Sequence, residues 1–454
     1  MALSEPNSNV TVVEEKTGEE IKKTAPARLL SFDRDTISRT LIPWARKGGL
    51  AILDQGLTSG SNFLISVLLA RWLMPDQYGA YAVAFAIYVL LTIVYQSLVL
   101  EPMAVFGGSS YRNNLRSYLR SLLRIHFGLS LAIFLALGVS TAITHRLAIS
   151  AGLPGALAGL TIALPWMQLF WLARRSFYLE LSPKQAVKGA FLYSTLVLGA
   201  LYLVNRAGLL SPVSAFLLMG LGAAGTAVLM LLRLPMGLRR GSPALRSREV
   251  WYRHWTYGRW ALAACIVGWI PTYAYYPLLS TFASMRQSGE LKALMNLTLP
   301  LEQTKAALSI LFLLYAASVH EDEGKSSARV LCGRVTLAAV GGTLLYWAMI
   351  MPIRSRVFHL LYSGRYTEVT QLLPIVALGS IFSSASYGPL IALRAMESPY
   401  SVFSAVAIAT MLSLLVGVPA TWTFGLTGAI WGSVLADMIT FITVSLAFRR
   451  KLIS

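Results

Sequence analysis

Long apolar runs alternate with short polar segments along the chain after its first 28 residues. A helix needs about 20 apolar residues to cross the hydrocarbon core of a bilayer. The pattern therefore predicts an all-α membrane protein with about twelve transmembrane helices in two six-helix lobes around a central cavity. The predicted spans are residues 48–70, 78–104, 125–145, 153–173, 186–204, 209–232, 259–281, 291–319, 328–351, 368–393, 400–422 and 426–447.

The composition supports a chain that faces lipid. Of the 454 residues, 56% are hydrophobic and 13% are charged, whereas a soluble protein carries about 25% charged residues. The two cysteines and five histidines are scattered along the chain. Their spacing predicts no disulfide framework, no metal site and no cofactor.

The net charge of +19 follows from where the Lys and Arg residues lie. With a cytoplasmic N-terminus, the inside segments hold 30 of the 39 basic residues, the outside loops hold 8, and Lys305 lies in a span. This bias obeys the positive-inside rule. We therefore expect a multi-pass protein with both termini in the cytoplasm, and no nucleic acid as a partner.

The longest predicted cytoplasmic loop separates two groups of six spans. The predicted parts are a disordered cytoplasmic tail (1–28), an amphipathic juxtamembrane segment (29–47), an N-terminal six-helix lobe (48–232), a basic cytoplasmic linker (233–258) and a C-terminal six-helix lobe (259–454).

A faint internal repeat relates the two lobes. Gly79 and Gly289 are 210 residues apart, and Gln77 and Gln287 share that offset. Internal repeats are common in transporters, where the substrate site lies between the repeats.

Polar residues inside the first and eighth spans are the first candidates for function, because a charged group at mid-bilayer costs about 2.5–3.5 kcal/mol. Those of the first span recur at helical spacing and form one stripe. They could line a watery cavity or only join helices, and we favour the cavity. The candidate cavity residues are Asp54, Thr58, Ser61, Asn62, Asn296, Glu302, Gln303 and Lys305.

Charged residues elsewhere each have two interpretations. Glu302 and Lys305 are three residues apart, so they could neutralise each other, or Lys305 could receive a phosphate. Arg174, Arg175 and Arg259 lie at the predicted inner mouth. Their guanidinium groups match phosphate geometry, but topological anchoring explains them as well.

Two carboxylates inside spans are candidates for ion coupling. They are Asp54 in the first span and Asp437 in an otherwise apolar twelfth span. Either could instead bind a neighbouring helix, and for Asp437 we favour that structural role.

The sequence carries no catalytic motif that we recognise. It has no Gly-rich phosphate loop followed by Lys and Ser or Thr, and no nucleophile elbow. The predicted outside loops are short, which argues against a membrane glycan polymerase or ligase. We therefore expect a protein that is not an enzyme.

Three segments carry a resemblance to a known family. They are the residues ARWLMPDQYG at 70–79, LYSGRY at 361–366 and GLTGAIWG at 425–432. The first resembles the loop after the first helix of polysaccharide and O-antigen flippases, which belong to the multidrug/oligosaccharidyl-lipid/polysaccharide exporter superfamily. The others resemble its segments before the tenth helix and at the start of the twelfth. Met74 and Ser363 stand where the family commonly has Gly.

The resemblance implies a function as well as a fold. It implies two six-helix lobes that work by alternating access and turn an undecaprenyl-diphosphate-linked oligosaccharide from the cytoplasmic to the periplasmic leaflet of the bacterial inner membrane. Expected partners are this substrate, membrane lipids, and the polymerase and glycosyltransferases of polysaccharide and lipopolysaccharide synthesis. A drug or cation antiporter of the same superfamily is the alternative.

Overall fold

The computed structural model describes residues 42–147, 152–234 and 245–453, and every regular element in these ranges is helical. The first half of the chain contains α3 (Ile42–Trp72), α4 (Pro75–Tyr95), η3 (Gln96–Leu100), α5 (Glu101–Gly108), η4 (Arg112–Asn114), α6 (Leu115–Arg146), α7 (Leu153–Leu179), α8 (Pro183–Arg206) and α9 (Pro212–Arg233). The second half contains α10 (Ser247–Tyr273), α11 (Tyr275–Phe282), α12 (Met285–Asn296), α13 (Leu299–Ile350), η5 (Met351–Ile353), α14 (Arg354–Tyr362), η6 (Thr367–Leu372), α15 (Leu373–Ala395) and α16 (Pro399–Ile453).

The chain divides into two compact units, which are described separately. In the first, Met1–Leu53, the described residues begin α3. The predicted tail and most of the predicted amphipathic segment lie outside the described residues. The second unit, Asp54–Ser454, contains all the contacts discussed below.

The prediction of an all-α, multi-pass membrane protein is confirmed. Among the described residues, eight helices are long and apolar enough to span a bilayer, and nine if α10 and α11 form one span bent by 44°. This length criterion counts α16 once, although its 55 residues cover two predicted spans. Gly425, at φ 55° and ψ −128°, breaks α16 between them, in a conformation that favours glycine.

The eighth and ninth predicted spans are divided differently in the structure. The eighth predicted span breaks into α12 and the start of α13 just before Pro300, which lies in the first turn of α13. Proline is favoured there because it lacks the N–H that a first turn leaves unpaired. The ninth predicted span continues α13 without a break, so one helix of 52 residues covers most of both.

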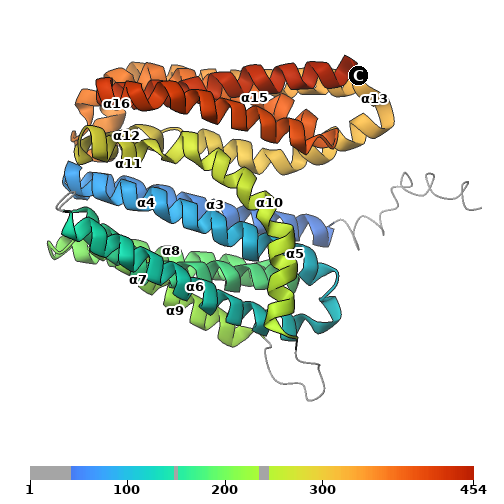
Figure 1. Ribbon diagram of the computed structural model, residues 1–454, viewed down its shortest axis with the longest axis horizontal. Coiled ribbons are helices and arrows are strands. Elements are labelled where there is room, and N and C mark those ends of the chain that lie inside the picture. The colour runs from blue at the N-terminus through green and yellow to red at the C-terminus, as the bar shows by residue number, and fades with distance from the viewer. Residues whose placement is uncertain (1–41, 148–151, 235–244, 454) are drawn as a thin grey trace, which may run out of the picture. The chain divides into compact units, whose positions relative to one another are not determined.

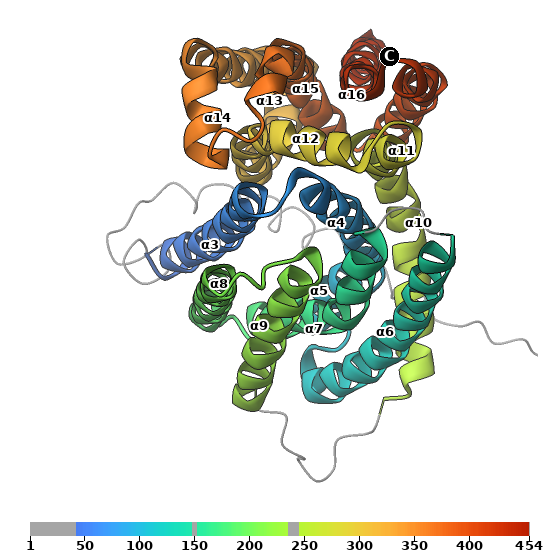
Figure 2. The same ribbon diagram turned by 90° about the vertical axis from the view of Figure 1, so that its left-hand side faces the viewer.

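Most packing occurs within each half of the chain. In the N-terminal half, α7 packs against α9, α6 and α4, and in the C-terminal half α15 packs between α13 and α16. Figure 1 shows these two groups on either side of α4 and α12. The main contact between the halves is α4 against α12, which also lie side by side in Figure 2.

Helix α10 joins the two groups. It begins at Ser247, inside the predicted linker, and its first part packs against η3, α5 and α6, whereas it also contacts α16. The buried residues of this first part are Val250, His254 and Gly258. Their spacing of four residues places them in one narrow stripe, and that contact makes the polar start of α10 helical.

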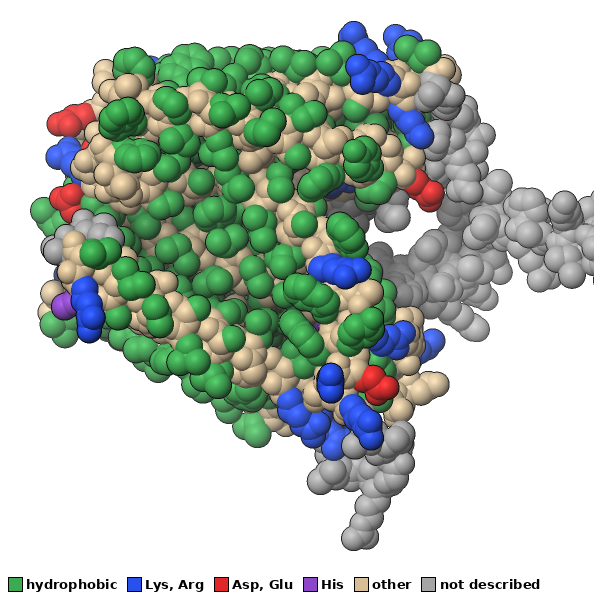
Figure 3. Space-filling model, viewed as in Figure 1, with side chains coloured by type: hydrophobic (Ala, Val, Ile, Leu, Met, Phe, Trp, Pro, Cys, Tyr) green, Lys and Arg blue, Asp and Glu red, His purple; other side chains and the backbone are tan. Residues whose placement is uncertain are grey.

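Charged side chains gather at the ends of the helices. Figure 3 shows a broad hydrophobic face with charged side chains at two opposite edges, one of which is dominated by Lys and Arg with few Asp or Glu, whereas the other mixes the two signs more evenly. We call the first the basic end, where α6 and α10 begin and α15 ends. The other is the seam end, where α3 ends and α4 and α12 begin.

Candidate functional site

A buried ion pair holds the first of the predicted cavity residues. Asp54 of α3 is fully buried, and Arg174 Nε of α7 donates to its two carboxylate oxygens at 3.0 and 2.8 Å. Arg174 Nη2 lies 2.6 Å from Asp54 Oδ2, to which the Tyr178 hydroxyl also donates. Both charges are therefore paired inside the N-terminal half.

The rest of the first stripe is split between buried and exposed positions. Thr58 and Ser61 are buried and donate to carbonyls of their own helix, Asp54 O at 2.8 Å and Thr58 O at 3.2 Å. Asn62 is exposed. Of these residues, only Asn62 presents a side chain with no hydrogen bond among the described residues.

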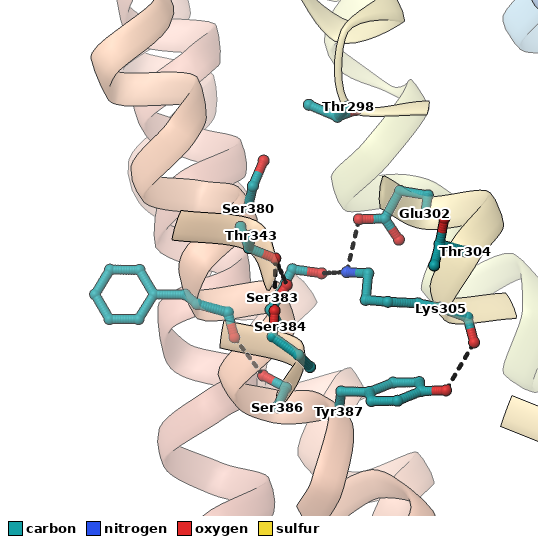
Figure 4. A network of polar contacts seen from close by, with 12 residues as sticks. Thr298, Glu302, Thr304, Lys305, Thr343, Ser380, Ser383, Ser384, Ser386 and Tyr387 are labelled. Carbon is teal, nitrogen blue, oxygen red and sulfur yellow. Dashed lines mark hydrogen bonds and ion pairs between the residues drawn. The ribbon is translucent and has the colours of Figure 1, made fainter. Parts of the chain in front are cut away.

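A second polar group lies in the C-terminal half (Figure 4). Lys305 Nζ lies 2.7 Å from Glu302 Oε1 and donates to Ser383 Oγ of α15 at 2.8 Å. The Tyr387 hydroxyl donates to the Lys305 carbonyl at 2.7 Å. As in the N-terminal half, the charged pair is neutralised by partners of the same half.

Sequence reasoning missed the α15 side of this group. Ser384 of α15 shares a 2.7 Å hydrogen bond with Thr343 of α13, and both side chains are buried. The available signal was the serine-rich run at 380–386 within an apolar span. Asp437 of α16 lies beside α15, near Gly379, and has no hydrogen bond or ion pair among the described residues.

Gln303 links the two halves near these groups. Ser59 Oγ of α3 donates to Gln303 Oε1 of α13 at 2.8 Å, and Gln55 Nε2 donates to Ser59 Oγ at 3.1 Å. Both hydrogen bonds are exposed, which makes them easy to exchange for water or for a polar ligand.

Asn296 belongs to a buried cluster that joins the halves at the seam end. Its Oδ1 accepts from Ser66 Oγ of α3 at 2.9 Å, and its Nδ2 donates to the Tyr78 hydroxyl of α4 at 3.0 Å. The Tyr362 hydroxyl of α14 lies 3.5 Å from the same Nδ2 and donates to Ala293 O at 2.9 Å. Four helices therefore meet at one amide.

The two glycines of the internal repeat form the closest contact between α4 and α12. A Cβ added to Gly79 would overlap the Met285 carbonyl oxygen, and one added to Gly289 would lie 2.8 Å from the Pro75 carbonyl oxygen. Met285 follows Pro75 by the same 210 residues, so the two contacts are reciprocal. We call this contact, with the Asn296 cluster beside it, the seam.

The repeat extends to hydrogen bonds and helix boundaries. Ser66 and Tyr78 are hydrogen-bonded side chain to side chain at 3.1 Å. Their counterparts 210 residues later are joined as well, since Ser288 Oγ donates to Tyr276 O at 2.8 Å. α4 begins at Pro75 and α12 at Met285. The faint sequence repeat thus corresponds to a two-fold relation between α4 and α12.

The three segments that carried the family resemblance meet at the seam end. Arg365 Nη1 donates to the Leu73 carbonyl, and Arg71 Nη1 donates to the Leu360 carbonyl at 3.0 Å. The Leu426 N–H, just after Gly425, donates to Gln287 Oε1 of α12 at 2.8 Å. These segments therefore close the seam rather than line the predicted cavity.

Lys292 of α12 is the second residue of the predicted span 291–319 and is therefore counted among the eight basic residues of the outside loops. It is 6% exposed, and its Nζ lies 3.9 Å from the ring centroid of Phe85 of α4. It has no hydrogen bond or carboxylate partner among the described residues. Its repeat counterpart is Ala82, so this cation is present on one side only.

The three predicted inner-mouth arginines do not form one group. Arg174 is buried against Asp54. Arg175 is exposed, and Arg259 is exposed with its guanidinium 5.5 Å from the Trp260 ring centroid. Within the described residues, no three His, Cys, Asp or Glu side chains are placed to hold a metal ion.

Comparison with known proteins gives the fold. No family model matches the sequence, and no curated protein matches it. A multidrug resistance MATE transporter of the MOP superfamily, described as inward-facing, matches with a TM-score of 0.71 at 14% identity over 88% of this chain and 98% of its own. Lipid II flippase MurJ, described as inward closed, matches at 0.69 with 11% identity over 88% of this chain and 87% of its own.

A MOP superfamily transporter from Pyrococcus furiosus matches at 0.63 with 13% identity, over 90% of this chain and 95% of its own. These likenesses extend over most of each chain. The protein therefore has the MOP superfamily transporter fold, as the resemblance implied.

Proposed function

We propose that the protein is a flippase that turns an undecaprenyl-diphosphate-linked oligosaccharide from the cytoplasmic to the periplasmic leaflet of the bacterial inner membrane by alternating access. The basic end is cytoplasmic in this proposal, in keeping with the positive-inside rule. The lipid tail stays in the bilayer, so the protein has to shelter only the diphosphate and the sugars.

The observation that carries the proposal is the buried, unpaired Lys292 of α12, which lies against α4 of the other half. Asp54 and Glu302 are each paired with a cation of their own half, whereas Lys292 is buried with no carboxylate partner. An unpaired buried charge is costly, and an anionic diphosphate would compensate it through charge-assisted hydrogen bonds. Asn296, Gln303 and Asn62 would add hydrogen bonds to phosphate or sugar hydroxyls.

The remaining predicted residues have supporting roles in this proposal. Asp54 and Arg174 fix α3 against α7, and Thr58 and Ser61 belong to the same helix face. Arg175 and Arg259 would attract the diphosphate at the inner mouth from exposed positions. Lys305 becomes a phosphate contact only if it leaves Glu302.

The test is transport by Lys292 variants in proteoliposomes, with a labelled undecaprenyl-diphosphate-linked oligosaccharide as the substrate. Loss of one charge-assisted contact, about 1.5–3 kcal/mol, predicts at least about a tenfold loss of flipping by Lys292→Gln, and Lys292→Arg should retain activity. Removal of an unpaired buried charge should not lower the melting temperature. Full flipping by Lys292→Gln would refute the proposal.

A drug or cation antiporter is the second candidate, and Asp437 is the observation that favours it. Its carboxylate lies inside α16 with no ion pair among the described residues, so it could bind a coupling cation. Asp54 is the weaker coupling candidate, because Arg174 already pairs with it. Cation-dependent drug efflux that is lost in Asp437→Asn but kept in Lys292→Gln would favour the antiporter.

A further inference from the structure

Two arginines near the start of α10, Arg124 of α6 and Arg253 of α10, are held in place by neutral groups. Arg124 Nη1 of α6 lies 3.5 Å from Ser247 Oγ, and Arg253 donates to the Tyr111 and Ser110 hydroxyls at 3.3 and 3.4 Å. Arg248, which directly follows Ser247 in the sequence, is exposed. None of the three arginines has a carboxylate partner among the described residues. Arg124 and Arg253 are thus positioned by hydrogen bonds, and the positive charge of all three arginines is left uncompensated.

At the seam end, in contrast, one exposed arginine is paired with two carboxylates. Arg286 Nε lies 2.8 Å from Glu290 Oε1, and its Nη2 lies 3.3 Å from Glu368 Oε2. Between residues 246 and 260, four arginines accompany a single acidic residue, Glu249. The start of α10 therefore carries a local excess of positive charge that no carboxylate among the described residues compensates.

Aromatic side chains share the outer face of α10 with these arginines. Val250, His254 and Gly258 are the buried side of the helix, whereas Tyr252 is 70% exposed and Trp255 is 42% exposed. Tyr252 and Trp255 follow Arg248 by four and seven residues, so the three side chains lie on one helical face. Figure 3 shows Lys and Arg side chains beside hydrophobic ones over this part of α10.

We propose that Arg124, Ser247 and Arg248 bind the headgroup phosphate of an anionic phospholipid of the surrounding bilayer, with Tyr252 and Trp255 beside its glycerol and upper acyl carbons. The guanidinium fork matches phosphate, and Trp and Tyr concentrate at headgroup level. A soluble anion would use the arginines but would have no need of two exposed aromatic side chains on the same face.

The test measures lipid retention by the purified full chain with native mass spectrometry, using phosphatidylglycerol and phosphatidylcholine as probes. Each arginine near an anionic lipid surface contributes roughly fivefold in affinity. Arg124→Gln with Arg248→Gln should therefore weaken phosphatidylglycerol binding by at least about tenfold, and Glu249→Gln should strengthen it. The matched control is Arg206→Gln with Arg356→Gln, two exposed arginines at the seam end, which should leave binding unchanged.

Four results would overturn the proposal. They are equal retention of the two lipids, equal loss in the control pair, retention of undecaprenyl diphosphate in place of phosphatidylglycerol, and displacement of phosphatidylglycerol by millimolar inorganic phosphate. An unchanged melting temperature in phosphatidylcholine shows that the variants are folded, since neither Arg124 nor Arg248 is buried. The readout is lipid binding, so it does not depend on the transported substrate.

Discussion

The two ends of the surface between the halves differ in where their polar groups find partners. At the seam, Asn296 bonds to Ser66 and Tyr78 of the other half, and Gly79 and Gly289 bring two backbones into contact. Asp54 lies eighteen residues before Trp72, the last residue of α3, and is therefore about 27 Å from the seam end of that helix. Its carboxylate pairs with Arg174 of its own half. The seam is thus held shut by bonds between the halves, whereas the charged groups near Asp54 and Lys305 are paired within each half. Toward the basic end the halves are joined by the exposed Ser59–Gln303 hydrogen bond and by the start of α10, where His254 bonds to Tyr118 and Leu98.

This difference indicates which contacts must break and which must form when the two halves move relative to each other. Two rigid bodies can separate at the seam only by breaking hydrogen bonds and the glycine contact. Near Asp54 and Lys305 they can approach or separate with little change inside either half. Such an arrangement suits alternating access, in which one end closes as the other opens.

The largest effect is expected from breaking the ion pair between Asp54 and Arg174 in the N-terminal half. Asp54→Asn leaves the Arg174 charge buried without a counterion, which costs about 3–5 kcal/mol. The melting temperature should fall sharply. Replacing both residues, Asp54→Leu with Arg174→Met, should recover most of the loss, and failure of the double variant to recover would contradict a purely structural pair.

The next effect concerns the glycine contact of the seam. Gly79→Ala places a methyl group against the Met285 carbonyl, and overpacking of this kind costs about 1–3 kcal/mol. We expect an open seam, measured as faster thiol labelling of a cysteine at the buried Ser288 position. Gly60→Ala is the matched control, because nothing lies within 4 Å of that position, and labelling equal to that control would argue against the contact.

A smaller effect is expected from removing the side-chain amide of Asn296, which contacts Ser66 and Tyr78 of the other half. Asn296→Ala removes hydrogen bonds that are each worth about 0.6 kcal/mol in membrane proteins. The free energy of unfolding should fall by about 1–2 kcal/mol, and Ser288 labelling should rise less than in Gly79→Ala. Asn296→Asp keeps the acceptor for Ser66 and should separate the two contributions.

The smallest effect is expected at the exposed hydrogen bond between Ser59 and Gln303, away from the seam. Gln303→Ala removes an exposed hydrogen bond to Ser59 and should change the free energy of unfolding by less than about 1 kcal/mol. If Gln303 contacts the substrate, the flipping rate should still fall. A stability loss as large as that of Asn296→Ala would mean that this region is also held by contacts between the halves.

The helices were predictable because hydrophobic runs set them. The predicted span 186–204 lies inside α8, and 209–232 matches α9 within three residues at its start. The first part of α10 was not predicted, because its sequence is polar and aromatic and it becomes helical by packing Val250, His254 and Gly258 on the other half. Local patterns carry no information about such a contact.

The sequence indicated the local pair of Glu302 and Lys305, which the structure contains, but not the pairs between distant helices. Polar residues inside spans drew attention one by one, yet Asp54 and Arg174 are 120 residues apart and only the fold brings them together. Lys292 was counted as a loop charge because it lies near the start of a predicted span. The 210-residue offset was a weak signal, and its meaning appears only in the reciprocal contact at the seam.

The most direct test follows two distances at once by electron-electron resonance, in a variant whose native cysteines are alanine. One spin-label pair spans the halves at the seam end, at Arg206 and Glu368, and the other spans them at the basic end, at Lys188 and Arg394; all four positions are exposed. Addition of the lipid-linked oligosaccharide should populate a state with a longer first distance and a shorter second one. Two distances that stay fixed, or that lengthen together, would contradict alternating access about the seam.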